Sequence, residues 1–173
     1  MFTSVVYFNH IEGLQGKGWG SYVLKLKLFV ILCLAWLPLQ ARACPVPVND
    51  ELGIHLDTLN RERQRAGLPA FTLSAELTRI AQDHACDMSR RGYFSHNSPD
   101  GRGMMDRLAN ARVTGICRAA ENIAKGQRDV PHVMRVWLQS DGHRRNILDQ
   151  RLTLVGFGRA SGAYWVQLFA APC

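Results

Sequence analysis

The spacing of apolar residues after residue 48 predicts an amphipathic helix from Asn49 or Asp50 to about Ala66. Either of the first two residues can cap the helix, and Gly67 and Pro69 end it. Recurrence every three or four residues places the apolar side chains on one face, which is buried in a globular protein. That face consists of Leu52, Leu56, Leu59 and the stem of Arg63.

A second helix, capped by Ser74 and ended by Gly92, carries the clearest pattern in the chain. Its apolar positions follow one another at helical intervals without a miss, and glycine is common just past a helix end. The stripe consists of Leu77, Ile80, Ala81, His84, Ala85 and Met88. Since His84 lies inside the stripe, it is predicted to be a hydrogen-bonded core histidine rather than a ligand.

The middle of the chain alternates turns with short elements. Pro99-Asp100-Gly101 predicts a turn, and a short helix with Leu108 facing inward follows it. Residues 113–118 are expected to form a short strand. A further helix is predicted to begin at Asp129 and to be interrupted at Gly142.

Near the end of the chain the pattern changes to that of strands. Residues 152–160 and 163–170 are rich in β-branched and aromatic residues, and Ser161-Gly162 separates them. This arrangement predicts an antiparallel hairpin. Because an isolated hairpin is only marginally stable, helices must cover it. The chain is therefore expected to belong to the α+β class, with helices layered on a sheet.

Residues 1–43 have the features of a secretory signal peptide. Lys25 and Lys27 precede the 12-residue apolar run 28–39, and Ala41-Arg42-Ala43 follows it. These are the basic flank, apolar core and small-residue cleavage site of such a leader. A membrane-spanning helix needs about 20 apolar residues. A retained anchor and lipid attachment at Cys44 are the weaker alternatives, and the residues before Tyr22 are an upstream start-site extension or a longer basic leader.

Cleavage after Ala43 leaves one domain, residues 44–173, in the periplasm or outside the cell. The leader carries three of the seven formal net positive charges. The remaining charge suits solubility or attraction to anionic envelope surfaces, and no basic cluster is dense enough to predict a nucleic-acid partner. No transmembrane helix is expected after cleavage, and the oligomeric state is left open.

Cysteine usage also fits an oxidising compartment. The predicted mature chain retains four cysteines: Cys44, Cys86, Cys117 and Cys173. An even number in a small exported domain predicts two disulfides. Three pairings are possible, of which Cys86–Cys117 with Cys44–Cys173 is favoured, and buried free thiols are the alternative.

Three residues are candidates for a shared site. His96 and His143 stand where regular structure is predicted to end, and loops on a rigid scaffold concentrate functional groups. Glu121 lies among apolar residues, where an unpaired carboxylate is costly. Two imidazoles and a carboxylate would supply three ligands for zinc or another divalent cation and leave a fourth position for water. His55 and His132 have no such partners at metal spacing and are predicted to be surface residues.

Several sequence blocks occur in a fixed order along residues 52–170. The strongest is Trp137–Leu148, which contains His143. The others include Leu59–Arg63, Phe94–Arg102 with Arg107, Glu121–Ala124, Gly156–Gly158 and Tyr164–Gln167. Together they resemble the CAP superfamily of cysteine-rich secretory proteins, antigen 5 and pathogenesis-related proteins, also called SCP domains, and most of all its bacterial branch.

The resemblance implies an α-β-α sandwich with a three-stranded antiparallel sheet covered by helices. It also implies a central cleft with two histidines and two acidic residues, which binds zinc or other divalent cations in some members. His96, Glu121 and His143 match three of these four positions. Ser140 stands at the fourth, where many animal and plant members have Glu and bacterial relatives commonly have Ser.

Four further residues are candidates for lining this cleft: Ser140, Asn122, Asn146 and Arg102. The two asparagines would support the cleft by hydrogen bonds or cap helices and turns, and Arg102 would line the cleft or stabilise its loop. Ser140 and His143 share a helix face only if the helix continues through Gly142. A Ser–His nucleophile is therefore a minor alternative.

Three functions remain open at this point. The first is a binding module for an envelope component, lipid or protein, with the metal organising the cleft. The second is a metal-dependent hydrolase or peptidase, in which Glu121 acts as ligand or general base and a metal-bound water as nucleophile. The third is a structural secreted domain with a vestigial cleft. Ser140 in place of a carboxylate favours binding over catalysis.

Overall fold

The computed structural model describes residues 44, 47 and 49–173 of the chain. The predicted signal peptide and its cleavage site fall on residues 1–43, outside the described part. Within that part, no helix has the length and apolar character needed to cross a membrane. The helices are α2 (Asn49–Arg65), α3 (Ala75–Arg91), α4 (Met104–Asn110), α5 (Val130–Gln139) and α6 (Asp141–Ile147), and the strands are β1 (Thr72–Leu73), β2 (Ile116–Lys125), β3 (Leu154–Ala160) and β4 (Tyr164–Pro172).

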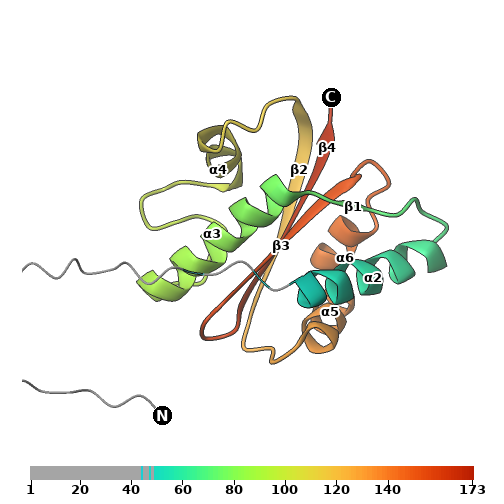
Figure 1. Ribbon diagram of the computed structural model, residues 1–173, viewed down its shortest axis with the longest axis horizontal. Helices are drawn as coiled ribbons and strands as arrows, with labels where there is room; N and C mark the ends of the chain where they lie inside the picture. Colours follow the sequence, from blue (N-terminus) through green and yellow to red (C-terminus); the bar gives the residue numbers. More distant parts are fainter. Residues whose placement is uncertain (1–43, 45–46, 48) are drawn as a thin grey trace, which may run out of the picture. The chain divides into compact units, whose positions relative to one another are not determined.

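Helices cover both faces of a sheet whose strand order is β1-β3-β4-β2 (Figure 1). Helices α3 and α4 lie on one face, and α2, α5 and α6 lie on the other. The predicted α-β-α sandwich is thus confirmed, and so is the hairpin, formed by β3 and β4. The sheet has four strands instead of three, because β1 adds a parallel edge beside β3. With only two residues, β1 is too short to show an alternating pattern in the sequence.

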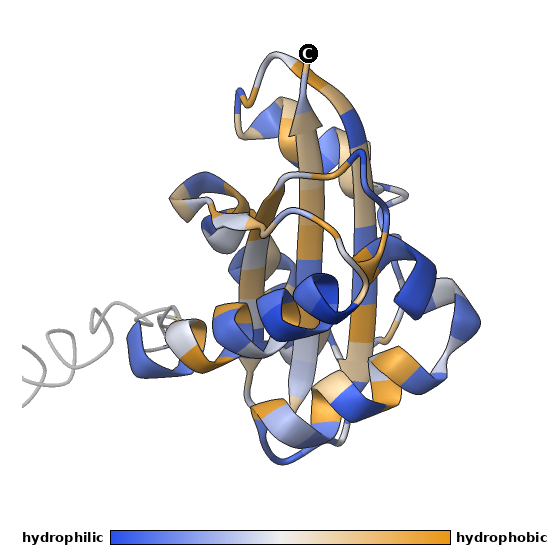
Figure 2. Ribbon diagram, turned by 90° about the vertical axis from the view of Figure 1, so that its right-hand side faces the viewer, coloured by the Kyte–Doolittle hydropathy of each residue, from blue (hydrophilic) through white to orange (hydrophobic). Residues whose placement is uncertain are grey.

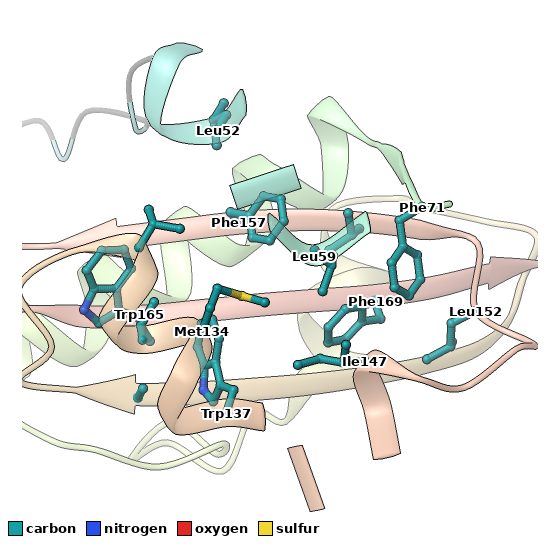
Figure 3. Close-up of a cluster of buried hydrophobic side chains, with 14 residues drawn as sticks. Leu52, Leu59, Phe71, Met134, Trp137, Ile147, Leu152, Phe157, Trp165 and Phe169 are labelled. Carbon is teal, nitrogen blue, oxygen red and sulfur yellow. The ribbon is translucent and has the colours of Figure 1, made fainter. Parts of the chain in front are cut away.

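Side chains of the central strand β4 alternate between two cores, as the period of a strand requires. Val166 and Leu168 pack on the α3 side. Trp165 and Phe169 pack on the opposite side, where the aromatic core drawn in Figure 3 lies beneath α2, α5 and α6. The ribbon of the sheet is accordingly mostly hydrophobic, whereas the helices alternate between hydrophilic and hydrophobic positions (Figure 2). Both cores are built around one strand.

Helix α3 lies directly on the backbone of β3 because two residues there have no side chain. A Cβ atom on Gly156 would stand 2.2 Å from the backbone of Leu77 and Thr78, and one on Gly158 would stand 2.4 Å from the backbone of Ala81. Atoms cannot approach this closely without displacement of the helix or strand. The ends of α3 are as predicted, with Ser74 accepting a hydrogen bond from the Leu77 amide and Gly92 in the left-handed conformation.

Two element boundaries differ from the sequence prediction. Strand β2 begins at Ile116 and runs to Lys125, paired along its length with β4, so that Glu121 lies within the strand. The prediction ended the strand at Arg118, since polar residues interrupt its apolar pattern. The predicted break at Gly142 is also wrong, because α5 ends one turn earlier and the extended backbone of Ser140 separates it from α6.

Two disulfides form as predicted, but the favoured pairing is wrong. The bonds join Cys44 to Cys86 and Cys117 to Cys173. The antiparallel register of β2 and β4 places Ile116 opposite Pro172, which brings Cys117 to the end of the chain. Cys86 lies instead in the α3 core, where Cys44 packs against it.

His55 lies in the core, so its predicted surface position is wrong. The residue is 2% exposed, and its ring stacks on Trp165 with the ring centroids 5.7 Å apart and packs edge-to-face with Phe157 with the centroids 4.3 Å apart. Position 55 lies between Leu52 and Leu59 on the buried stripe of α2, and that spacing was the missed signal. His132 is half-buried at the start of α5, whereas His84 is buried as predicted.

Arg63, whose stem was predicted to extend this stripe, is buried in full. Its guanidinium lies over the Phe71 ring at 3.9 Å. It donates hydrogen bonds to four backbone carbonyl oxygens, those of Pro69, Ile147, Asp149 and Leu152. One side chain therefore ties the end of α2 to the segment between α6 and β3.

Candidate functional site

Three of the predicted site residues, His96, Glu121 and His143, lie near the outer edge of strand β2. Because neighbouring side chains of a strand point to opposite faces, Glu121 faces α3 and α4, and Asn122 faces α6. As β2 is the outer strand of the sheet, groups from both faces can approach each other around its edge. His96 comes from the segment between α3 and α4, and His143 comes from α6.

The Glu121 carboxylate is the centre of this cluster. Oε1 accepts a hydrogen bond from His96 Nδ1 at 2.8 Å, and Oε2 accepts one from Arg107 Nη2 at 2.7 Å. His84 Nε2 lies 3.9 Å from Oε1. The side chains of Glu121 and Arg107 are only 3% and 9% exposed, whereas that of His96 is 53% exposed. A buried ion pair thus supports a histidine that reaches solvent.

The backbone that carries His96 is held at two adjacent carbonyls. Arg107 Nη1 donates to the carbonyl oxygen of His96 at 3.0 Å, and His84 Nε2 donates to that of Ser95 at 3.1 Å. Burial lowers the pKa of His84, against the opposing effect of the Glu121 charge. A neutral His84 with its proton on Nε2 suits this bond. Helix α3 and helix α4 therefore fix the position of the His96 loop together.

A network of amides connects β2 to the helix that carries His143. Asn122 Nδ2 donates to the His143 carbonyl oxygen at 3.2 Å and to Gln167 Oε1 at 3.1 Å. Asn146 Nδ2 donates to Asn122 Oδ1 at 2.9 Å and lies 3.4 Å from the Glu121 carbonyl oxygen. The two asparagines thus tie the backbone of α6 to β2 by hydrogen bonds, and their role in lining a cleft stays a prediction.

The imidazole of His143 is partly buried and favours the neutral form. Burial lowers its pKa, and the nearby His96 lowers it further. Its Nδ1 atom is buried without a hydrogen-bond partner in the described part of the chain. No ion pair there joins His143 to Glu121. His143 therefore stands beside the His96–Glu121 pair rather than within it.

The side chains as they stand do not fit the predicted divalent cation. Among residues 44, 47 and 49–173, no group of three or more His, Cys, Asp or Glu side chains is arranged to hold a metal ion. One oxygen of Glu121 accepts an imidazole N–H, and the other pairs with a guanidinium. A cation at either oxygen would have to compete with one of these two donors. Zinc binding stays a prediction.

The side chains of two other predicted residues make no hydrogen bond or ion pair with His96, Glu121 or His143 in the described part of the chain. Arg102 pairs with Asp100 of its own loop, at 2.8 Å from Oδ2 and 3.1 Å from Oδ1, which is the loop-stabilising alternative. Ser140 is the residue between α5 and α6, and its side chain makes no capping hydrogen bond. Arg107 was not selected as a site residue from the sequence, although a buried Glu121 requires a cationic partner.

An α-β-α sandwich with a histidine–carboxylate pair at the edge of its sheet defines a CAP-type domain. The family model described as CAP, the cysteine-rich secretory protein family, matches residues 56–169, and the chain belongs to this family. The resemblance to the CAP superfamily that the ordered sequence blocks indicated is thereby confirmed.

Relatives with this domain occur in several bacteria. YkwD of Bacillus subtilis is 36% identical over 115 residues, which cover 66% of this chain and 44% of YkwD. The membrane protein YlbC of the same organism is 34% identical over 114 residues, covering 66% of this chain and 32% of YlbC. The chain thus spans less than half of the length of these relatives. An extracellular SCP-domain protein from Bacillus anthracis has a TM-score of 0.65 at 30% identity, over 75% of this chain and 45% of that one.

Proposed function

We propose that this chain is an exported CAP-domain protein whose His96–Glu121–His143 site binds a cell-envelope component, a lipid or a protein. Three observations support export, to the periplasm or beyond the cell. The first is the leader pattern of residues 1–43. The second is the presence of two disulfides, which persist in oxidising compartments. The third is that the Bacillus anthracis relative is an extracellular protein.

The observation that carries the binding proposal is the almost sealed Glu121 carboxylate beneath the half-exposed His96 ring. A buried ion pair contributes little net stability and is often replaceable by apolar residues. Its presence at the edge of the sheet, beside two histidines, therefore favours a functional role. The rings of His96 and His143 offer hydrogen bonds to hydroxyl, amide or ester groups, which sugars, peptides and lipid headgroups all carry.

Export is tested by mass spectrometry of the protein recovered from the cell envelope and the medium. The proposal expects an N-terminus at Cys44 and all four cysteines of the domain oxidised. Recovery of the uncut chain in the cytoplasm, with reduced cysteines, would contradict it.

Binding is tested by retention of the purified protein on peptidoglycan fragments, lipid vesicles and denatured protein. Saturable retention on one of these, lost in His96→Ala, is the expected result. Arg102→Ala is the matched control, because the Arg102 guanidinium pairs with Asp100 rather than with Glu121. Equal retention by the wild type and His96→Ala would refute the proposed site. No retention on any surface would favour a structural domain with a vestigial site.

A hydrolase is the second candidate, and the His96–Glu121 hydrogen bond is the observation that favours it. A carboxylate that accepts from one imidazole nitrogen orients the ring and leaves the other nitrogen available to act as a base. Turnover of a bound substrate that is lost in Glu121→Gln would support an enzyme. Retention without turnover would support a binding module.

A further inference from the structure

The positive charge that lies beside the Glu121 carboxylate belongs to a side chain of the protein, that of Arg107. We infer that Arg107 occupies the role that a divalent metal would have beside Glu121, so that ligand binding here is independent of metal. This inference rests on the site of the proposed function, but it does not depend on which ligand the site binds. It rests on the contacts of Arg107, which comes from α4, a helix with no role in the predicted ligand set.

The Arg107–Glu121 pair leaves little of the carboxylate for another cation. The 2.7 Å contact lies between side chains that are 9% and 3% exposed, so water screens their attraction weakly. Displacing the guanidinium would leave a buried charge without a partner, which is strongly destabilising. A metal ion approaching Glu121 would also meet the fixed positive charge of Arg107.

The second oxygen of Glu121 also has a hydrogen-bond partner. It lies 2.8 Å from His96 Nδ1, a hydrogen-bond distance that leaves no room for a metal ion between the imidazole and the carboxylate. Arg107 stabilises this arrangement from the other side by donating to the His96 carbonyl oxygen at 3.0 Å. One guanidinium therefore holds the backbone of the loop and the carboxylate that orients its ring.

Arg107 is thus a positioning residue for His96. With Nδ1 protonated toward Glu121, Nε2 is the atom of the half-exposed ring that remains for a ligand. A chelator should leave this atom and its hydrogen bond unchanged. Loss of the Arg107 charge should free one carboxylate oxygen and remove the repulsion that opposes a divalent ion.

The test is a calorimetric titration of the purified protein with zinc alone at neutral pH. The wild type should bind zinc no more tightly than about 100 μM, and Arg107→Met should bind it about a hundredfold more tightly. Arg102→Met is the matched control, since it removes a guanidinium that pairs with Asp100, and it should behave as the wild type. Wild-type binding of one zinc per chain at micromolar affinity would overturn the inference, as would a folded Arg107→Met that gains no affinity.

If Arg107→Met does not fold, as judged by circular dichroism, ring-nitrogen NMR of the wild type decides the question. The His96 signals should show a protonated Nδ1 and stay unchanged on addition of zinc or chelator. A zinc-dependent shift of these signals would overturn the inference. The retention assay is a separate readout, because a protein that retains no ligand can still exclude zinc through Arg107.

Discussion

Acidification should destabilise the fold through His55, which is held neutral in an aromatic environment. Its ring is 2% exposed between Trp165 and Phe157, and neither ring nitrogen has a hydrogen-bond partner in the described part of the chain. Burial, helped by the nearby charge of Arg159, lowers its pKa from 6.5 to about 3. Protonation must therefore occur mainly after the chain unfolds.

The size of the effect follows from the two pKa values. A histidine whose pKa is lowered in the folded state contributes full stability above its unfolded pKa, and this stability is lost as the pH falls toward the folded pKa. Between about pH 7.5 and about pH 4.5, the loss from this one group amounts to about 2.7 kcal/mol. The lowered pKa values of His84 and His143 act in the same direction, so the contribution of His55 must be isolated by substitution.

The assay compares urea unfolding of the wild type and His55→Phe at these two pH values, with the disulfides intact. Phenylalanine keeps an aromatic ring in the site but cannot be protonated. The decrease in unfolding free energy on acidification should therefore be smaller in His55→Phe by about 2.7 kcal/mol. An equal decrease in both proteins would show that His55 is not held neutral by burial.

Other substitutions test the packing of the fold by the same urea measurement. Gly156→Ala should lose about 2 kcal/mol or more, because its Cβ has no room against α3, whereas Gly53→Ala, with open space in α2, should gain up to about 1 kcal/mol. Arg63→Met should lose about 3 kcal/mol or more, since four backbone carbonyls lose their donor and two of them, those of Ile147 and Leu152, are buried. Replacing Cys117 and Cys173 together with Ser should cost about 4 kcal/mol, as the bond closes a loop with a sequence separation of 56. In each case, wild-type stability would contradict the contact described.

The sequence predicted the elements whose signal is local. The whole of helix α3 could be predicted because its apolar stripe, its Ser74 cap and its Gly92 end all lie within one segment of the sequence. The disulfide pairing was missed because it depends on the register between β2 and β4, which no local pattern encodes. The extent of β2 was missed because Glu121 interrupts the apolar pattern of the strand.

The site was predictable in part for the same reason. Ordered sequence blocks singled out His96, Glu121 and His143, and the structure brings the first two into direct contact. The partner of the carboxylate could not be chosen, because several arginines lie near it in the sequence. Only the packing of α4 against β2 shows that Arg107 fills this role.

The most direct test of the binding site is an NMR titration of the imidazole resonances with whichever ligand is retained in the binding assay. The ring signals of His96 and His143 should shift and saturate over the concentrations that saturate retention, with chelator present throughout. Retention that persists while both rings keep their unbound signals would place the ligand elsewhere on the protein and rule out the proposed site.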